Sequence, residues 1–163
     1  MCTSNRPLMF NDLVSDFAQN PNKVGECWKW VALTPKGSLV SPLKRYIWTP
    51  GWNKATGRVF PNNPAENWFT LGRGAFHGFK TPEILVRELW LKHNRHGYRS
   101  FPVRFEYDPE DLVGVAPKQI ATTHLWLDPN EILLVKEAAG LTVSDRTLRS
   151  WERAAELTIG SQS

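Results

Sequence analysis

Hydrophobic and polar residues alternate most regularly along residues 101–107 and 120–127. This period of two predicts β-strands, because successive side chains of a strand point to opposite faces of a sheet. Residues 27–33 and 39–48 are also rich in apolar side chains, with an interruption at Pro42 in the second stretch. The sequence Pro-Lys-Gly-Ser between them predicts a hairpin turn, so these two stretches are expected to form paired strands.

Helix starts are marked by capping residues. Thr81 is followed by Pro82 and Glu83, and this order favours a first helical turn. A threonine hydroxyl can accept a backbone N–H, and proline fits the first helical position. The helix is expected to run to about His96, where Gly97 supplies a stop. Apolar spacing predicts three further helices, at residues 11–19, 131–139 and 144–157.

The remaining segments and the order of elements predict the fold class. Residues 49–67 are rich in proline, glycine and asparagine, which predicts a long irregular loop, and residues 68–79 predict a short strand broken by glycines. Strands and helices are segregated, so we expect an α+β fold: a small mixed or antiparallel sheet with a central capped helix and C-terminal helices. We expect an α+β domain at 1–130 and a C-terminal helical segment at 131–163, which either docks on that domain or stands apart.

Composition narrows the classes of function. The chain has 163 residues, a net charge of +4 and eight tryptophans, which is enough apolar surface for a single core. A mildly basic protein suits a polyanionic partner such as nucleic acid. Cys2 and Cys27 lack metal-ligand spacing, so we expect reduced thiols and neither a metal nor another cofactor. Without a secretory or membrane-spanning apolar run, the sequence favours the cytoplasm and no membrane contact.

A glycine-rich stretch, residues 72–80, lies immediately before the cap at Thr81. Flexible backbone and positive charge beside a helix start predict an anion-binding site, although the glycines also suit tight turns or a bulge. Further on, basic residues are interleaved with Trp90 and Tyr98. This composition is typical of nucleic-acid-binding surfaces, and it is also found on solvated helix faces. The predicted binding surface comprises Arg73, His77, Lys80, Arg87, Lys92, Arg95 and Arg99.

Two smaller groups of residues suggest alternative sites. Trp48 and Trp52 flank the turn at residues 49–51; they predict a binding hot spot for a host protein, with core packing as the alternative. His93 and His96 are three residues apart, a spacing at which two helical histidines could share a metal ion. The simpler interpretation is that their charge stabilises the end of a helix.

The segment near the C-terminus carries a more specific pattern. The run Val-Ser-Asp-Arg-Thr-Leu-Arg at residues 143–149, with a small residue at Ala138, resembles the recognition-helix region of MerR-type helix-turn-helix proteins. This resemblance implies a DNA-binding regulator. The residues that it would direct to phosphates and base edges of the major groove are Ser144, Arg146, Thr147 and Arg149.

The order of motifs along the chain resembles that of small, mostly uncharacterised phage and prophage proteins. It includes Trp-Lys-Trp-Val at residues 28–31 and Ala-Phe-His-Gly-Phe at residues 75–79. This resemblance implies a macromolecule-binding protein of phage or mobile-element type, and inhibition of host defence machinery is one role open to it. We favour this interpretation, with nucleic acid or a host protein as partner and the oligomeric state left open.

An enzyme is the alternative. The sequence Glu-Ile-Leu-Leu that begins at Glu131 is similar to the corresponding ending of ADP-ribosyltransferases. That resemblance implies an NAD-using transferase in which Glu131 polarises the nicotinamide ribose, with His77 in the same cleft.

Overall fold

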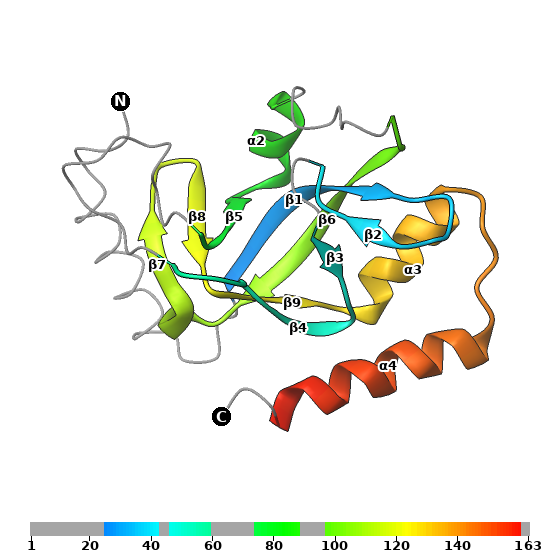
Figure 1. Cartoon of the computed structure of the whole chain (residues 1–163). Coiled ribbons are helices and arrows are strands. Elements are labelled where there is room, and N and C mark those ends of the chain that lie inside the picture. Colours follow the sequence, from blue (N-terminus) through cyan, green and yellow to red (C-terminus); the bar gives the residue numbers. More distant parts are fainter. Residues whose placement is uncertain (1–24, 43–45, 60–73, 89–96, 161–163) are drawn as a thin grey trace.

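The computed structural model describes residues 25–42, 46–59, 74–88 and 97–160. Within them the chain forms a large antiparallel sheet and three α-helices (Figure 1). The strands are β1 Gly25–Leu33, β2 Leu39–Val40, β3 Ile47–Trp48, β4 Gly51–Lys54, β5 Phe76–Phe79, β6 Ser100–Tyr107, β7 Leu112–Val115, β8 Gln119–Thr122 and β9 His124–Leu127. The helices are α2 Pro82–Arg87, α3 Pro129–Ala138 and α4 Asp145–Ile159.

The strand order is β4-β9-β6-β1-β5-β8-β7, and β2 and β3 form a small pair that lies beside β1. Every pairing in this sheet is antiparallel. The predicted α+β class is therefore confirmed. Of the two sheet types expected, mixed or antiparallel, the described strands form an antiparallel one, and this sheet is larger than expected. None of the helices in the described residues is both long and apolar enough to cross a membrane.

β1 and β6 form the centre of the sheet. Their register runs without interruption from the pair Gly25 and Tyr107 to the pair Ala32 and Ser100. The strand predicted at residues 101–107 is confirmed, and all four of its alternating apolar side chains are buried. The strict alternation of this segment reflects a strand whose one face packs into the core.

The two faces of the sheet carry different clusters. The main core lies on the face covered by the β2–β3 pair and α3, and it includes Val31, Trp48 and Ile132. Trp30, the neighbour of Val31 in β1, points to the opposite face, where it packs with Leu85 of α2. The indole Nε1–H of Trp30 also donates to the Leu85 carbonyl oxygen at 3.2 Å. This bond attaches α2 to the centre of the sheet.

Residues 120–127 were expected to form one strand, and the structure shows two. The break lies at Thr123, whose N–H donates to the Asp111 carbonyl while its own carbonyl accepts the N–H of Ala55. The chain thus changes neighbours at this residue: β8 pairs with β5 and β7, whereas β9 pairs with β4 and β6. Thr122 is buried, and its hydroxyl donates to backbone carbonyls at Asp111 and His124.

The loop expected at residues 49–67 contains a strand, which corrects that prediction. β4 pairs with β9 from Gly51–Leu127 to Lys54–His124. Gly51 has a φ of 87°, which suits glycine at the sharp entry to the strand. Asn53 is buried and accepts hydrogen bonds from Tyr46 and Thr49, so an asparagine typical of loops serves here as a core residue. Residues 60–67 lie outside the described ranges.

Thr81 caps α2 through its hydroxyl, which accepts the N–H of Ile84. The helix ends at Arg87, because Glu88 has a ψ of 62°, which is not helical. It was expected to continue to about His96, but residues 89–96 lie outside the described ranges, as does the helix expected at 11–19. The strand expected within 68–79 begins at Phe76, and the strand expected at 39–48 forms β2 and β3 on either side of residues 43–45, which are not described.

Candidate functional site

α4 docks on the free edge of β4. Its buried residue is Ala155, which is 2% exposed. A Cβ atom added to Gly51 would lie 2.8 Å from the Ala155 Cα atom, so helix and strand backbones approach closely here. The backbone N–H of Trp52 donates to Thr158 Oγ1 at 2.9 Å. The docked side of α4 is thus fixed by small residues and by a specific hydrogen bond to the strand.

The opposite side of α4 carries three exposed arginines, which we name the arginine row: Arg146, Arg149 and Arg153. Residues spaced by three and four positions lie on one side of a helix. Arg153 precedes the buried Ala155 by two residues, which is about 200° around the helix axis. The row therefore faces away from the sheet and extends for about 10 Å along α4.

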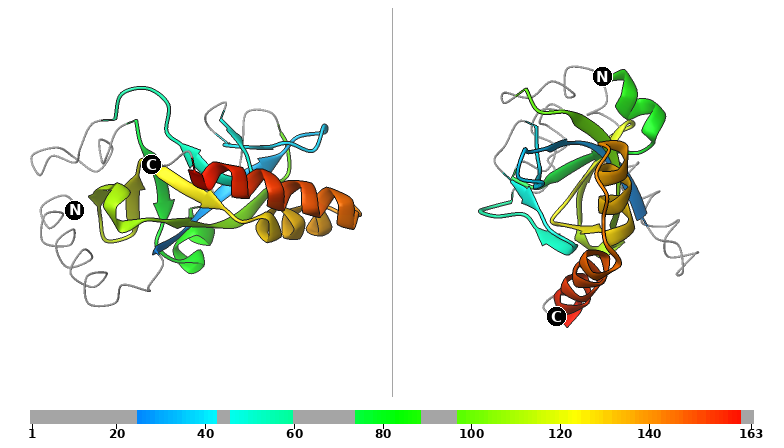
Figure 2. Two further views of the ribbon diagram at one scale, coloured as in Figure 1. Left: turned by 90° about the horizontal axis from the view of Figure 1, so that it is seen from below. Right: turned by 90° about the vertical axis from the view of Figure 1, so that its right-hand side faces the viewer.

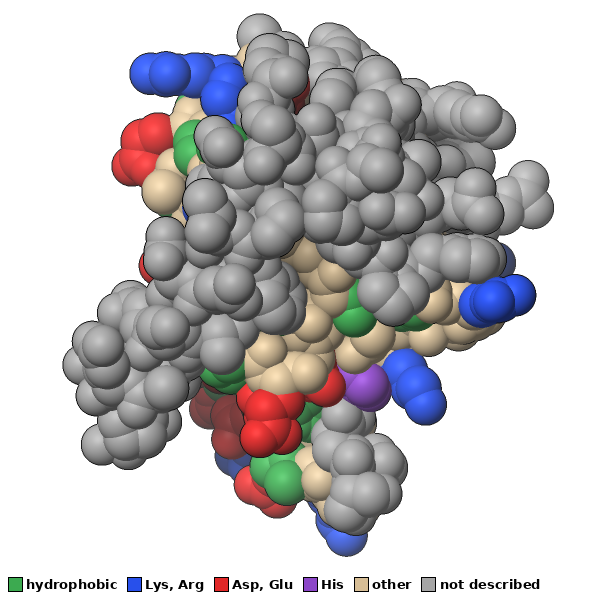
Figure 3. Space-filling model, turned by 90° about the vertical axis from the view of Figure 1, so that its left-hand side faces the viewer, with side chains coloured by type: hydrophobic (Ala, Val, Ile, Leu, Met, Phe, Trp, Pro, Cys, Tyr) green, Lys and Arg blue, Asp and Glu red, His purple; other side chains and the backbone are tan. Residues whose placement is uncertain are grey.

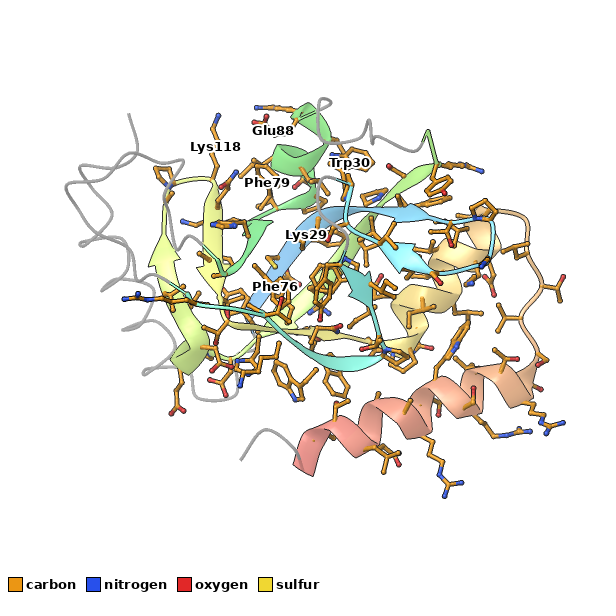
Figure 4. All side chains as sticks on the ribbon, in the orientation of Figure 1. Lys29, Trp30, Phe76, Phe79, Glu88 and Lys118 are labelled. Atoms are coloured by element: carbon orange, nitrogen blue, oxygen red, sulfur yellow. The ribbon has the colours of Figure 1, made fainter. Side chains whose placement is uncertain are left out.

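The guanidinium groups of the arginine row make no ion pair or hydrogen bond with any other residue that the structure describes. Arg104 in β6 shows the contrast, because its guanidinium lies 2.6 Å from Glu26 and 2.7 Å from Glu106. Figure 4 shows nitrogen-tipped side chains that project from α4 away from the sheet. The row thus presents guanidinium groups that form no ion pair in the described part of the fold.

The other polar groups at the start of α4 are used within the helix. Ser144 Oγ accepts the N–H of Thr147 at 3.1 Å, and its hydroxyl also donates to the Thr147 hydroxyl. Ser150 donates its hydroxyl to the Thr147 carbonyl at 2.6 Å. Of the predicted DNA-reading residues, Arg146 and Arg149 are therefore free to meet a ligand, whereas Ser144 and Thr147 build the helix cap.

α3 and α4 lie side by side and run in opposite directions (Figures 1 and 2). Their connection turns at Gly140, which has a φ of 82°. α3 packs on the main core through Ile132 and Val135, while α4 reaches the same core through the partly buried Trp151. Both helices therefore contact the sheet, and α4 does so through one narrow side that leaves most of its side chains exposed.

The predicted basic surface is only partly described: Arg73, Lys92 and Arg95 lie outside the described ranges. Lys80 is half-buried, and this burial lowers its pKa. Arg87 is exposed at the end of α2, and the guanidinium of Arg99 lies 4.8 Å from the Phe101 ring centre. His77 is half-buried in β5, where its carbonyl accepts a hydrogen bond from Lys29. The described members are distributed over β5, α2 and the segment before β6.

The two tryptophans predicted as a hot spot occupy different environments. Trp48 is 4% exposed, and its ring packs against Tyr46, Phe76 and Phe105 at centre distances of 4.6–4.9 Å. Its indole Nε1 is buried and has no hydrogen-bond partner among the described residues. Trp52 is half-buried and meets Trp126 edge-on at 5.6 Å. A protein partner could contact Trp52 directly, whereas Trp48 is part of the core.

The structure does not bring Glu131 and His77 together. His77 follows Phe76 in β5, and because Phe76 packs on the main core, His77 points to the other face of the sheet. Glu131 lies in the first turn of α3, which packs on the main-core face. Burial raises the pKa of its carboxyl group, and the charge of Arg104 opposes this effect. An active site that uses both residues is not formed by this geometry.

A carboxylate-bearing region lies beside β9. His124 Nδ1 is 3.5 Å from Asp111 Oδ2 and 2.8 Å from Thr123 Oγ1. Figure 3 shows a histidine next to Asp and Glu side chains on this face of the molecule. The pair joins the turn before β7 to β9, beside the hydrogen bonds that Thr122 and Thr123 donate to the Asp111 carbonyl.

Metal-binding and thiol chemistry find little support in the part of the chain that the structure describes. No three His, Cys, Asp or Glu residues lie close enough there to hold a metal ion. The predicted histidine pair, His93 and His96, falls outside that part, as does Cys2. Cys27 is buried, and burial raises the pKa of its thiol to about 12, so it stays protonated at neutral pH.

Comparison of the chain with known protein families, with curated proteins and with solved structures finds no match. The resemblances to phage proteins, to helix-turn-helix regulators and to ADP-ribosyltransferases therefore stay predictions. The residue that sequence reasoning missed is Arg153. The spacing could have identified it, because Arg153 lies seven positions after Arg146 and therefore on the same side of the predicted helix.

Proposed function

We propose that this protein binds nucleic acid through the arginine row of α4. The observation that carries the proposal is the row itself: three arginines without an ion-pair partner among the described residues, on the outer side of a helix whose inner side is fixed to the sheet edge. Arginine guanidinium groups form strong, forked hydrogen bonds with phosphate oxygens. A rigid helix holds them in place, so little conformational freedom is lost when a phosphate backbone is bound.

The charge distribution of the molecule supports this choice of partner. The net charge of +4 favours approach to a polyanion, and Arg104, which sits between two glutamates, adds little to it. If all three arginines contact phosphates, the logarithm of the binding constant should fall with the logarithm of salt concentration with a slope of about −2.7. Such binding is modest, and it suits a role in which the protein recruits or shields nucleic acid beside a second partner.

The wider role proposed from the sequence is that of a macromolecule-binding protein of phage type that interferes with host defence machinery. Nucleic-acid binding fits this role, because many defence systems act on nucleic acid. Arg87 at the end of α2 offers a second basic position, with Lys80 before it. These residues form a competing site, and the experiment that tests α4 must include them.

The test is the fluorescence anisotropy of a labelled 20-base-pair DNA duplex titrated with protein across a salt series. The triple variant Arg146→Gln, Arg149→Gln, Arg153→Gln should lose at least about tenfold in affinity and flatten the salt slope toward zero. A matched control removes three exposed positive charges elsewhere: Lys36→Gln, Lys54→Gln, Lys118→Gln. It should retain most of the affinity and the slope.

Three outcomes contradict the proposal. An absence of binding by the wild-type protein at low salt excludes nucleic acid as the partner. Equal losses of affinity in the two triple variants show that binding depends on the net charge of the protein and not on the arginine row. Loss of binding in Arg87→Gln, with the α4 triple variant unaffected, transfers the site to the end of α2.

A further inference from the structure

We infer that α4 lies along a single phosphate strand and binds nucleic acid without reading its base sequence. This inference rests on the proposed function and specifies the ligand surface of the same site. It departs from the helix-turn-helix resemblance, which implies a helix inserted into the major groove. The basis is the arrangement of charge and hydrogen-bonding groups around α4.

One flank of the arginine row is acidic. Asp145, Glu152 and Glu156 are exposed and spaced by seven and four residues, so they share one side of the helix. At about 100° per residue this side lies next to the row, between it and the docked face. The opposite flank carries Ser150, Ala154 and Leu157, of which Leu157 is 75% exposed. Positive charge is therefore confined to one narrow line along α4.

A charge line of this kind does not suit groove insertion. The major groove is about 12 Å wide, and an α-helix with its side chains is about 10–12 Å across, so an inserted helix meets phosphates on both sides. The carboxylates of Glu152 and Glu156 would then face one of the two phosphate walls. Contact with one strand from outside removes the second phosphate wall, so this repulsion is smaller, and all three arginines still reach phosphates.

α4 also offers few groups that can distinguish bases. Direct readout uses Asn, Gln, Asp or Glu against particular base edges, and Arg against guanine. α4 contains neither Asn nor Gln. The hydroxyls of Ser144, Thr147 and Ser150 are engaged within the helix. The arginines could favour guanine and the carboxylates of the acidic flank could favour cytosine, and a comparison of base compositions tests both possibilities.

The experiment is a competition assay on the full chain, with the labelled duplex displaced by unlabelled 20-base-pair duplexes of pure A·T, pure G·C and mixed sequence. We expect the three inhibition constants to agree within about threefold, with equal salt slopes. A preference of tenfold or more for any duplex overturns the inference. Failure of every duplex to bind, or binding that the triple arginine variant leaves unchanged, contradicts the proposed function instead, so the two failures are distinguishable.

A second variant tests the role of the acidic flank. Glu152→Gln with Glu156→Gln removes two carboxylates that lie beside the phosphates in our arrangement, and the spacing and docking of α4 should not change. Affinity for all three duplexes should rise by about two- to tenfold, without a gain in selectivity. Unchanged or weaker binding, or tighter binding to one composition alone, overturns the arrangement.

Discussion

The cluster around Trp48 and the docking of α4 attach their elements to the same sheet in opposite ways. Trp48 fixes the β2–β3 pair by burying a large aromatic ring among Tyr46, Phe76 and Phe105. α4 is fixed by a close backbone approach at Gly51 and by few buried side chains. The first attachment supplies stability through buried area, whereas the second supplies position and leaves most side chains free for other uses.

The arginines of the sheet and of α4 differ in the same way, because one is bound within the fold and the others are left free for a ligand. Arg104 lies on the sheet, and hydrogen bonds with Glu26 and Glu106 raise its pKa despite the opposing effect of partial burial. The arginines of α4 have no such partners among the described residues. The difference teaches that the sheet uses its arginine to hold its own strands together, and that α4 has arginines available for a ligand.

The largest expected effect is at Trp48. Trp48→Ala leaves a cavity among three aromatic rings and should lower the free energy of unfolding by about 3–5 kcal/mol, measured by urea denaturation. Trp52→Ala is the control, because Trp52 is only half-buried; this variant should lose no more than about 2 kcal/mol. If both variants lose the same amount, the proposed contrast between core and surface tryptophans is wrong.

An intermediate effect is expected where α4 meets β4. Gly51 and Gly57 both have positive φ angles, 87° and 83°, but only Gly51 faces α4. Gly57→Ala should cost about 1–2 kcal/mol from its backbone conformation alone. Gly51→Ala should cost about 1–3 kcal/mol more, because the new methyl group overlaps the Ala155 backbone.

Trypsin digestion checks the same pair of variants by another route. In Gly51→Ala, α4 should be displaced and unfold locally, so that trypsin can cleave the backbone after Arg149 and Arg153. The protease concentrations used should leave Gly57→Ala intact. Equal stability losses and equal cleavage rates would show that the close contact at Gly51 does not hold the helix.

The smallest effect on stability is expected from the arginine row. Replacement of Arg146, Arg149 and Arg153 by glutamine should change the free energy of unfolding by less than about 0.5 kcal/mol, because these side chains are exposed and form no ion pair with another described residue. Urea denaturation of this variant beside the wild-type protein provides the measurement. A loss above 1 kcal/mol would show that the row stabilises the fold, and any change in binding would then need a different explanation.

Local pattern was sufficient for some of these elements. Residues 101–107 alternate because β6 pairs with β1 along its whole length and turns one face to the core. The cap at Thr81 was readable because its hydrogen bond lies within four residues of sequence. In both cases the physical cause is local, so the sequence alone carries the information.

Other features depend on contacts between distant segments. The break at Thr123 is invisible in the alternation, because it results from a change of neighbouring strand. β4 was hidden in a polar segment because Asn53 satisfies its amide within the core. The spacing of the arginine row was visible, but its exposure depends on which side of α4 docks on the sheet, and only the fold determines that.

The hydrogen bond from Trp52 N–H to Thr158 also has a consequence for solubility. β4 is the last strand on its side of the sheet, and an uncovered edge strand can pair with an edge strand of another copy. α4 occupies that edge and so prevents β4 from pairing with a strand of another molecule. A chain shortened before α4 would therefore lose its binding helix and also become prone to aggregate through β4.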